Sequence, residues 1–250
     1  MLLPNSRGGY SFLKGIGPYS GGVVAASGFA IEHVRLARVV PWKAGFERID
    51  AHLRESGRPR SALCAIALRS ATPFSFDGFN RFNASYVEVL KLWELFVDGV
   101  NPVARTNVAP VVDPPADPSL YSFAYTVPAA GSRRSFVVAG AGELPEGSLD
   151  PHDVVRRGEA SREALAVKAR FVLGLMEGRL TGLGVKWSDV TATNVYTAHD
   201  LNALLAAEIL PRIEAAAQHG VTWHYTRPPI VSIEYEMDLR GCSREVLIQV

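Results

Sequence analysis

The chain of 250 residues is 48% hydrophobic, which is enough for a packed core in one large domain or two small ones. Its formal net charge is +1, and no run of Lys or Arg marks a nucleic-acid-binding surface. The N-terminus lacks the zones of a signal peptide, and no stretch is long and apolar enough to span a bilayer. We therefore expect a cytoplasmic protein that binds neither nucleic acid nor membranes.

Residue types that hold metals and cofactors are sparse and scattered. Cys64 and Cys242 are far apart and fit neither a zinc spacing nor a disulfide framework. The six histidines show no metal-ligand spacing, and no glycine-rich run has the pattern of a nucleotide-binding loop. The sequence thus predicts that the chain uses neither a metal ion nor a nucleotide cofactor.

The first half of the chain alternates strand and helix patterns. Small and β-branched residues predict a strand over residues 23–31, and apolar runs predict strands over 63–68, 103–111 and 120–127. Between these strands, apolar residues recur at helical spacing. The two stripes are Trp42, Phe46, Ile49 and Leu53, and then Phe79, Phe82, Tyr86, Val89 and Trp93.

The second half shows a similar order after a Pro-, Gly- and Ser-containing linker at residues 128–134. Strands are expected over 135–141 and 190–196, with the last strands in 221–250. One helix carries the stripe Leu165, Ala169, Val172, Met176 and Leu180, and a further helical stretch over 199–218 must kink or split at Pro211. Each half therefore follows the order β-α-β-α-β-β. We predict an α+β chain of two fused copies of one small domain, at residues 1–130 and 131–250.

Short motifs in the first half carry a resemblance to a known family. They are the turn Gly17-Pro18-Tyr19-Ser20, the strand end Ser27-Gly28, Phe82-Asn83 with Tyr86, and the strand Ala104-Arg105-Thr106 followed by Val108. Together they resemble the RidA (YjgF) family of enamine and imine deaminases. The resemblance covers most of the chain in element order and is looser in the second half.

The resemblance implies a chorismate-mutase-like fold, in which a mixed sheet is backed by two helices and sheets of neighbouring domains close around a barrel-like core. It also implies sites in clefts between adjacent domains. From the intersubunit sites of the family and the edge strand at 103–111 we expect a homo-oligomer, with a trimer favoured. A fused, two-repeat chain of this kind most resembles the 2-aminomuconate and 2-amino-5-chloromuconate deaminases.

The family pattern assigns Arg105 and a glutamate to catalysis. A planar guanidinium can bind a substrate carboxylate bidentately. Relatives with one domain carry the glutamate fifteen residues after the arginine, where this chain has Leu120. In the second repeat the same register gives Ile230 and Glu245, so the arginine and the acid would come from unlike repeats. Glu234 and Glu236 remain competing acids.

Five further residues are expected to bind substrate: Tyr19, Ser27, Asn107, Arg69 and Arg227. The first three would line the pocket and donate hydrogen bonds. The two arginines could be second carboxylate anchors or packing residues, because arginine serves both purposes. Likewise, Arg105 could form a surface ion pair and Glu245 could be a solvated surface residue.

The resemblance implies hydrolytic deamination of an enamine conjugated to a carboxylate, with an aminomuconate-type dicarboxylate as the leading substrate. Three alternatives stay open at this point. The chain could be a broad 2-iminoacid deaminase, a chorismate-cleaving enzyme, or a binding module without activity.

Overall fold

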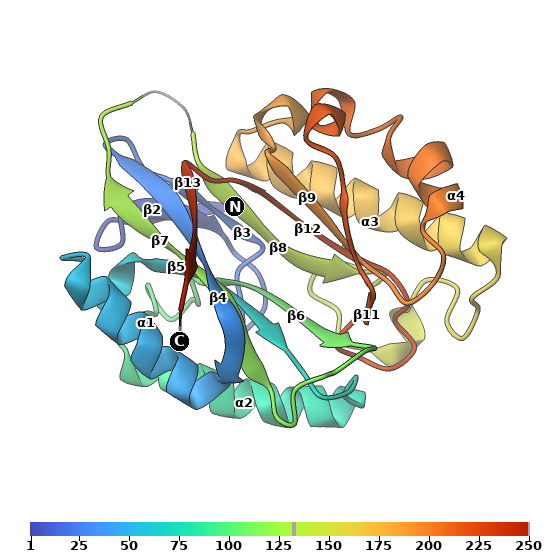
Figure 1. The fold of residues 1–250 in the computed structure, drawn as a ribbon, viewed down its shortest axis with the longest axis horizontal. Coiled ribbons are helices and arrows are strands. Elements are labelled where there is room, and N and C mark those ends of the chain that lie inside the picture. The colour runs from blue at the N-terminus through green and yellow to red at the C-terminus, as the bar shows by residue number, and fades with distance from the viewer. Residues whose placement is uncertain (132–133, 250) are drawn as a thin grey trace.

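The computed structural model describes residues 1–131 and 134–249. Two β-sheets face each other between two helical layers (Figure 1). The seven-stranded sheet has the order β1-β2-β3-β8-β12-β9-β10, and the six-stranded sheet has the order β11-β6-β5-β7-β4-β13. The strands of the seven-stranded sheet are β1 (Leu2–Asn5), β2 (Tyr10–Leu13), β3 (Gly22–Ala25), β8 (Phe136–Gly142), β9 (Ala192–Tyr196), β10 (Thr222–His224) and β12 (Glu236–Gly241). Those of the six-stranded sheet are β4 (Phe29–Pro41), β5 (Leu63–Arg69), β6 (Ala104–Pro110), β7 (Ser119–Pro128), β11 (Thr226–Arg227) and β13 (Arg244–Ile248).

Three long helices cover the outer faces of the sheets (Figure 1). α1 (Trp42–Glu55) and α2 (Phe76–Leu92) pack on the six-stranded sheet, and α3 (Arg162–Leu183) packs on the seven-stranded sheet. Their ends follow local chemistry: Ser75 and Ser161 cap the N-termini of α2 and α3, and Gly184 ends α3 with a φ of 70°. The short helical elements are η1 (Arg60–Ala62), η2 (Pro151–Asp153), η3 (Trp187–Asp189), α4 (Asn202–Leu204), η4 (Leu205–Ile209) and η5 (Glu214–His219).

Small side chains let the two sheets approach closely. Ala65, Ala104 and Ala124 on the six-stranded sheet pack in one core cluster with Ala139 of β8. Alternation along each strand then sends neighbouring residues to opposite faces. On β6, Thr106 faces the other sheet while Arg105 faces α2.

The predicted fold class is correct only as far as α+β, and the prediction of two RidA-like tandem repeats is wrong. Each sheet contains strands from both halves of the chain: β3 pairs with β8, β11 with β6, and β13 with β4. The second half also has one long helix, because the stretch around Pro211 forms only the short elements α4, η4 and η5. Hydrophobic patterns determine which segments become strands, but backbone pairing between distant strands determines the sheets. The boundary at 130/131 stays a prediction, and residues 132–133 of the predicted linker lie outside the described residues.

Most individual elements agree with the sequence patterns, including α1, α2, α3 and the strands β5 to β9. The strand expected over residues 23–31 is two strands, because a turn with Gly28 at a φ of 81° separates β3 from β4. In the part of the chain that the structure describes, no helix combines the length and the apolar character needed to cross a membrane.

Candidate active site

Arg105 is a buried cation on the α2 side of β6. Because Phe79, Asn83 and Tyr86 are spaced by four and three residues on α2, they lie on one face of that helix. The Arg105 Nη2 donates to the Asn83 Oδ1 at 2.7 Å, and the guanidinium lies 4.7 Å from the Tyr86 ring centroid and 5.5 Å from that of Phe79. The helix thus holds the guanidinium by one hydrogen bond and aromatic faces.

The turn with Tyr19 completes this surrounding. Ser20 donates from its backbone nitrogen to the Val103 carbonyl at 2.9 Å and from its hydroxyl to the Pro102 carbonyl at 3.0 Å. These bonds fix the turn beside the start of β6, and the Tyr19 ring centroid lies 4.9 Å from the Arg105 guanidinium. Two motifs far apart in the sequence therefore meet at Arg105.

The Arg105 guanidinium has no anionic partner among the described residues. It is 3% exposed, and no carboxylate of residues 1–131 or 134–249 lies within ion-pair distance of it. Its Nη1 is buried without a hydrogen-bond acceptor, as are the Nδ2 atoms of Asn83 and Asn107. Burial lowers the pKa of Arg105, although the group stays a cation. Since an unpaired buried charge is costly, these free donors indicate a site for an anion.

Glu236 is a buried acid that lines one cavity together with Arg105. It begins β12 and is 4% exposed, and no donor of the described residues hydrogen-bonds to its carboxyl group. Burial, and then the charge of Asp238, raise its pKa well above the ordinary glutamate value, while Arg179 and Arg105 act in the opposite sense. A carboxyl group whose pKa is raised in this way holds its proton more tightly than an ordinary glutamate does and can donate it.

A glycine provides the space for this carboxyl group. A Cβ at Gly140 on β8 would overlap the Glu236 Oε1 and would come within 3.2 Å of the Thr106 backbone. The sequence Gly140-Ala141-Gly142 does not match a nucleotide-binding pattern, and its first glycine is explained by close packing against Glu236.

Two further charged residues, Arg179 and Glu146, line this cavity and were missed by the sequence analysis. The Arg179 guanidinium binds both Glu146 carboxylate oxygens, at 2.6 and 3.0 Å. A signal was available, because Arg179 lies three residues after Met176 on the apolar stripe of α3, where a charged residue is unexpected.

Together these groups line a cavity of about 70 Å³, here called the Arg105 cavity. Its polar lining consists of Tyr19, Arg105, Asn107, Glu146, Ser148, Arg179 and Glu236. The structure thus brings together four predicted site residues, namely Arg105, Glu236, Tyr19 and Asn107. The Asn107 Oδ1 accepts from the Ser70 hydroxyl at 3.0 Å, so its free amide nitrogen is oriented.

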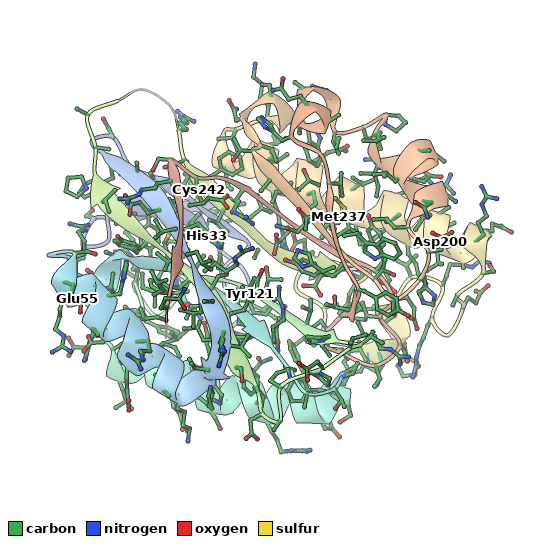
Figure 2. All side chains as sticks on the ribbon, in the orientation of Figure 1. His33, Glu55, Tyr121, Asp200, Met237 and Cys242 are labelled. Carbon is green, nitrogen blue, oxygen red and sulfur yellow. The ribbon has the colours of Figure 1, made fainter. Side chains whose placement is uncertain are left out.

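A larger cavity of about 240 Å³ lies between the two sheets and is here called the inter-sheet cavity. Figure 2 labels His33 and Tyr121, two of its lining residues, near the middle of the molecule. Asp238 in this cavity accepts hydrogen bonds from Thr106 and Asn194 at 2.7 Å each, and from Tyr196 at 2.8 Å.

Two histidines in the inter-sheet cavity are neutral at neutral pH. Burial lowers the pKa of His33 and of His224 to about 4, with further lowering by Arg240 and Arg69 respectively. The predicted acid Glu245 lines this cavity together with Arg105, but both of its carboxylate oxygens are bound by Arg240, at 2.8 and 3.1 Å. Desolvation raises the pKa of Glu245, but the hydrogen bonds and charge of Arg240 lower it further, so this pKa lies below the ordinary glutamate value.

The other predicted site residues lie outside the Arg105 cavity. Ser27 is exposed in the turn between β3 and β4, and Arg227 is exposed on β11. Arg69 is buried with its guanidinium 3.8 Å from the Tyr121 ring centroid. The competing acid Glu234 pairs with His199 at 2.8 Å.

The described residues contain no group of three or more His, Cys, Asp or Glu side chains placed to hold a metal ion. The Arg105 cavity itself offers guanidinium, carboxyl and hydroxyl groups. These can bind a carboxylate, donate a proton and receive one back.

Comparisons with known proteins show the family of this chain. Two solved structures are distant likenesses: a chorismatase (TM-score 0.48, 13% identity, 89% of this chain and 77% of that chain) and a cyanuric acid hydrolase (TM-score 0.45, 10% identity, 87% and 69%). A 2-amino-5-chloromuconate deaminase of Comamonas testosteroni is 43% identical over 246 residues, which is 97% of each chain. The family model described as 2-aminomuconate deaminase CnbZ matches residues 2–246. The chain therefore belongs to the 2-aminomuconate deaminase CnbZ family and is an enzyme that acts on a carbon–nitrogen bond.

Proposed function

We propose that this enzyme removes the amino group of an aminomuconate-type dicarboxylate, such as 2-aminomuconate or 2-amino-5-chloromuconate, by hydrolysis in the Arg105 cavity. One observation carries the proposal: a buried guanidinium without a carboxylate partner shares a cavity with the buried carboxyl group of Glu236. The names of the family and of the relative from Comamonas testosteroni support the substrate class.

Arg105 binds the substrate carboxylate next to the amine-bearing carbon. The carboxylate supplies the acceptor that the Arg105 Nη1 lacks and takes a hydrogen bond from the free amide of Asn107, which also lines the cavity. This contact fixes the reacting carbons in the cavity and balances the negative charge of the substrate.

Glu236 moves the proton. Its carboxyl group protonates the enamine carbon, which converts the enamine to an electrophilic imine, and Glu236 becomes a carboxylate. The carboxylate then accepts a proton from the attacking water. The resulting carbinolamine collapses to ammonia and a 2-oxo acid, and each substrate molecule consumes one water. We assign this role to Glu236 rather than Glu245, since the Glu245 carboxylate is already bound by Arg240.

Tyr19 closes the cavity over Arg105. Burial raises the pKa of its hydroxyl group, although Arg105 and Arg179 oppose the shift. The hydroxyl is therefore protonated at neutral pH and can donate a hydrogen bond to the carboxylate or to the carbinolamine oxygen.

Purified enzyme mixed with freshly generated 2-aminomuconate tests the function. We expect stoichiometric ammonia release coupled to loss of the muconate chromophore. Ammonia release from simple 2-imino acids but none from 2-aminomuconate would replace the proposal with the broad deaminase, and consumption of chorismate would replace it with a chorismatase.

The same assay tests whether a cofactor takes part. The steps above use only side chains and water, so activity should survive exhaustive chelation and dialysis. Loss of activity that one specific metal restores would require a different mechanism.

A further inference from the structure

The guanidinium of Arg179 is held as a fork at the wall of the Arg105 cavity. Its Nη1 donates to the Ala139 carbonyl at 2.8 Å and to the Gly140 carbonyl at 3.3 Å, so β8 fixes its orientation. The Nε and Nη2 edge is left for a carboxylate, which is the bidentate geometry that arginine prefers. The Arg179 side chain is only 8% exposed, so the fork is largely desolvated.

The carboxylate now in this fork comes from a loop of the chain. Glu146 is 51% exposed and lies in the loop after β8, in a turn closed by a 3.0 Å bond from the Ser148 nitrogen to the Pro145 carbonyl. Gly147 follows with a φ of 83°. Thus the buried guanidinium of Arg179, which the β8 backbone holds in place, binds the carboxylate of a half-exposed loop residue.

We propose that Arg179 is a second carboxylate-binding site, and that its ligand during turnover is the substrate carboxylate remote from the amine. Glu146 occupies the fork until the substrate arrives and then moves toward solvent. This inference rests on the proposed function, because it takes the substrate to be a dicarboxylate. Arg105 and Arg179 line the same cavity with Glu236, so the two carboxylates would bracket the reacting carbons.

When the substrate carboxylate replaces that of Glu146, Arg179 keeps both of its hydrogen bonds to a carboxylate. One carboxylate replaces another in the same two hydrogen bonds, and no buried charge is left unpaired. Glu146 therefore competes with the substrate, and its removal should tighten the binding of dicarboxylates only.

The test uses Glu146→Gln and two unreactive probes, muconate and sorbate. These six-carbon dienoic acids differ in that sorbate has a methyl group in place of the second carboxylate. A half-exposed ion pair competes weakly, so we expect Glu146→Gln to lower the Kd of muconate by about two- to fivefold. The Kd of sorbate should stay at the wild-type value. Direct substitution of Arg179 is a poorer test, since it also removes the contacts that hold β8.

Glu177→Gln is the matched control. Glu177 also lies bidentately on an arginine, Arg212, at 3.0 and 2.6 Å, and is 39% exposed, but it does not line the cavity. This variant should bind muconate and sorbate as wild type does. An equal gain in both variants would show a general charge effect and would overturn the inference.

Other outcomes also decide the matter. A purely structural ion pair predicts that Glu146→Gln leaves muconate binding unchanged or weakens it, and either result overturns the inference, as does failure of muconate to bind at all. Ammonia release from 2-aminomuconate is measured separately. Ammonia release without tighter muconate binding in Glu146→Gln would support the proposed function and overturn the second carboxylate site. Tighter muconate binding without ammonia release would support the second carboxylate site and overturn the proposed function.

Discussion

Glu236 and Asp238 lie two residues apart on the same face of β12, yet their surroundings differ completely. Asp238 accepts three hydrogen bonds, from Thr106, Asn194 and Tyr196, whereas Glu236 accepts none from the described residues. A buried carboxyl group with full hydrogen bonding stabilises the packing of the two sheets. One without it is retained at a cost in stability, which is typical of a group that works on a ligand.

The arginines show the same contrast. Arg240, in the inter-sheet cavity, is bound bidentately by Glu245, while Arg105 has one amide acceptor and a free Nη1. The inter-sheet cavity is larger, but in it Arg240 is paired with Glu245, and Asp238 accepts three hydrogen bonds. Cavity size is therefore a poorer guide to the reaction than unpaired charge.

The largest expected effect is the loss of kcat in Glu236→Gln. Removal of a general acid and base should lower kcat by about 10²- to 10⁴-fold at neutral pH. The wild-type rate should fall as pH rises through the raised pKa of Glu236, because the proton that it donates is then lost. Steady-state kinetics across pH check this, and a variant with wild-type kcat would end the assignment.

Glu236→Gln should lose activity but gain stability relative to wild type at high pH. A raised pKa means that the folded chain holds this proton more tightly than the unfolded chain does, so ionisation of Glu236 destabilises the wild type as pH rises. Relative to wild type, the variant should therefore gain thermal stability on the alkaline side. Melting curves at several pH values measure this difference.

Arg105→Lys should be the next largest effect. Lysine keeps the charge and loses the fork, and loss of a charge-assisted pair in a desolvated cleft costs on the order of 2 to 5 kcal/mol. This corresponds to roughly a 30-fold to several-thousand-fold drop in kcat/KM. The melting temperature should stay near that of wild type. Near-normal kinetics with intact folding would show that Arg105 is structural.

Asp238→Asn should affect stability more than catalysis, in contrast to Arg105→Lys. An amide in place of the carboxylate disrupts a network of three donors, and we expect a loss of about 1 to 3 kcal/mol in the free energy of unfolding. Because the charge of Asp238 raises the pKa of Glu236, the alkaline limb of the pH profile should move to lower pH. Chemical denaturation and a pH profile test the two parts, and an unmoved limb would contradict the second.

The smallest effect is expected for Glu245→Gln. Its partner is on the cavity wall, but the Glu245 side chain is 47% exposed, so loss of the pair should change the free energy of unfolding by about 0 to 1 kcal/mol. We also expect kcat/KM near wild type. If Glu245→Gln lost activity while Glu236→Gln kept it, the two acids would exchange roles.

The sequence by itself determined the elements and the motif around Arg105. Helical spacing set the inner faces of α1, α2 and α3, and the turn with Tyr19 could be paired with the Arg105 strand from a family pattern. These features are local, since a capping serine, an apolar stripe or a proline acts within a few residues. Glu236 was one of three competing acids, because the sequence shows where the glutamates are but not which charged groups lie next to each of them.

Only the tertiary structure decided which strands pair and which charges stay unpaired. β3 joins β8, and β13 joins β4, through backbone hydrogen bonds that carry no sequence signature, so the two predicted repeats became two shared sheets. The same long-range packing left Glu236 without a hydrogen-bond donor among the described residues, in one cavity with Arg105. Arg179 entered the site in this way too, because the desolvation and pairing of a charge depend on what the rest of the chain brings next to it.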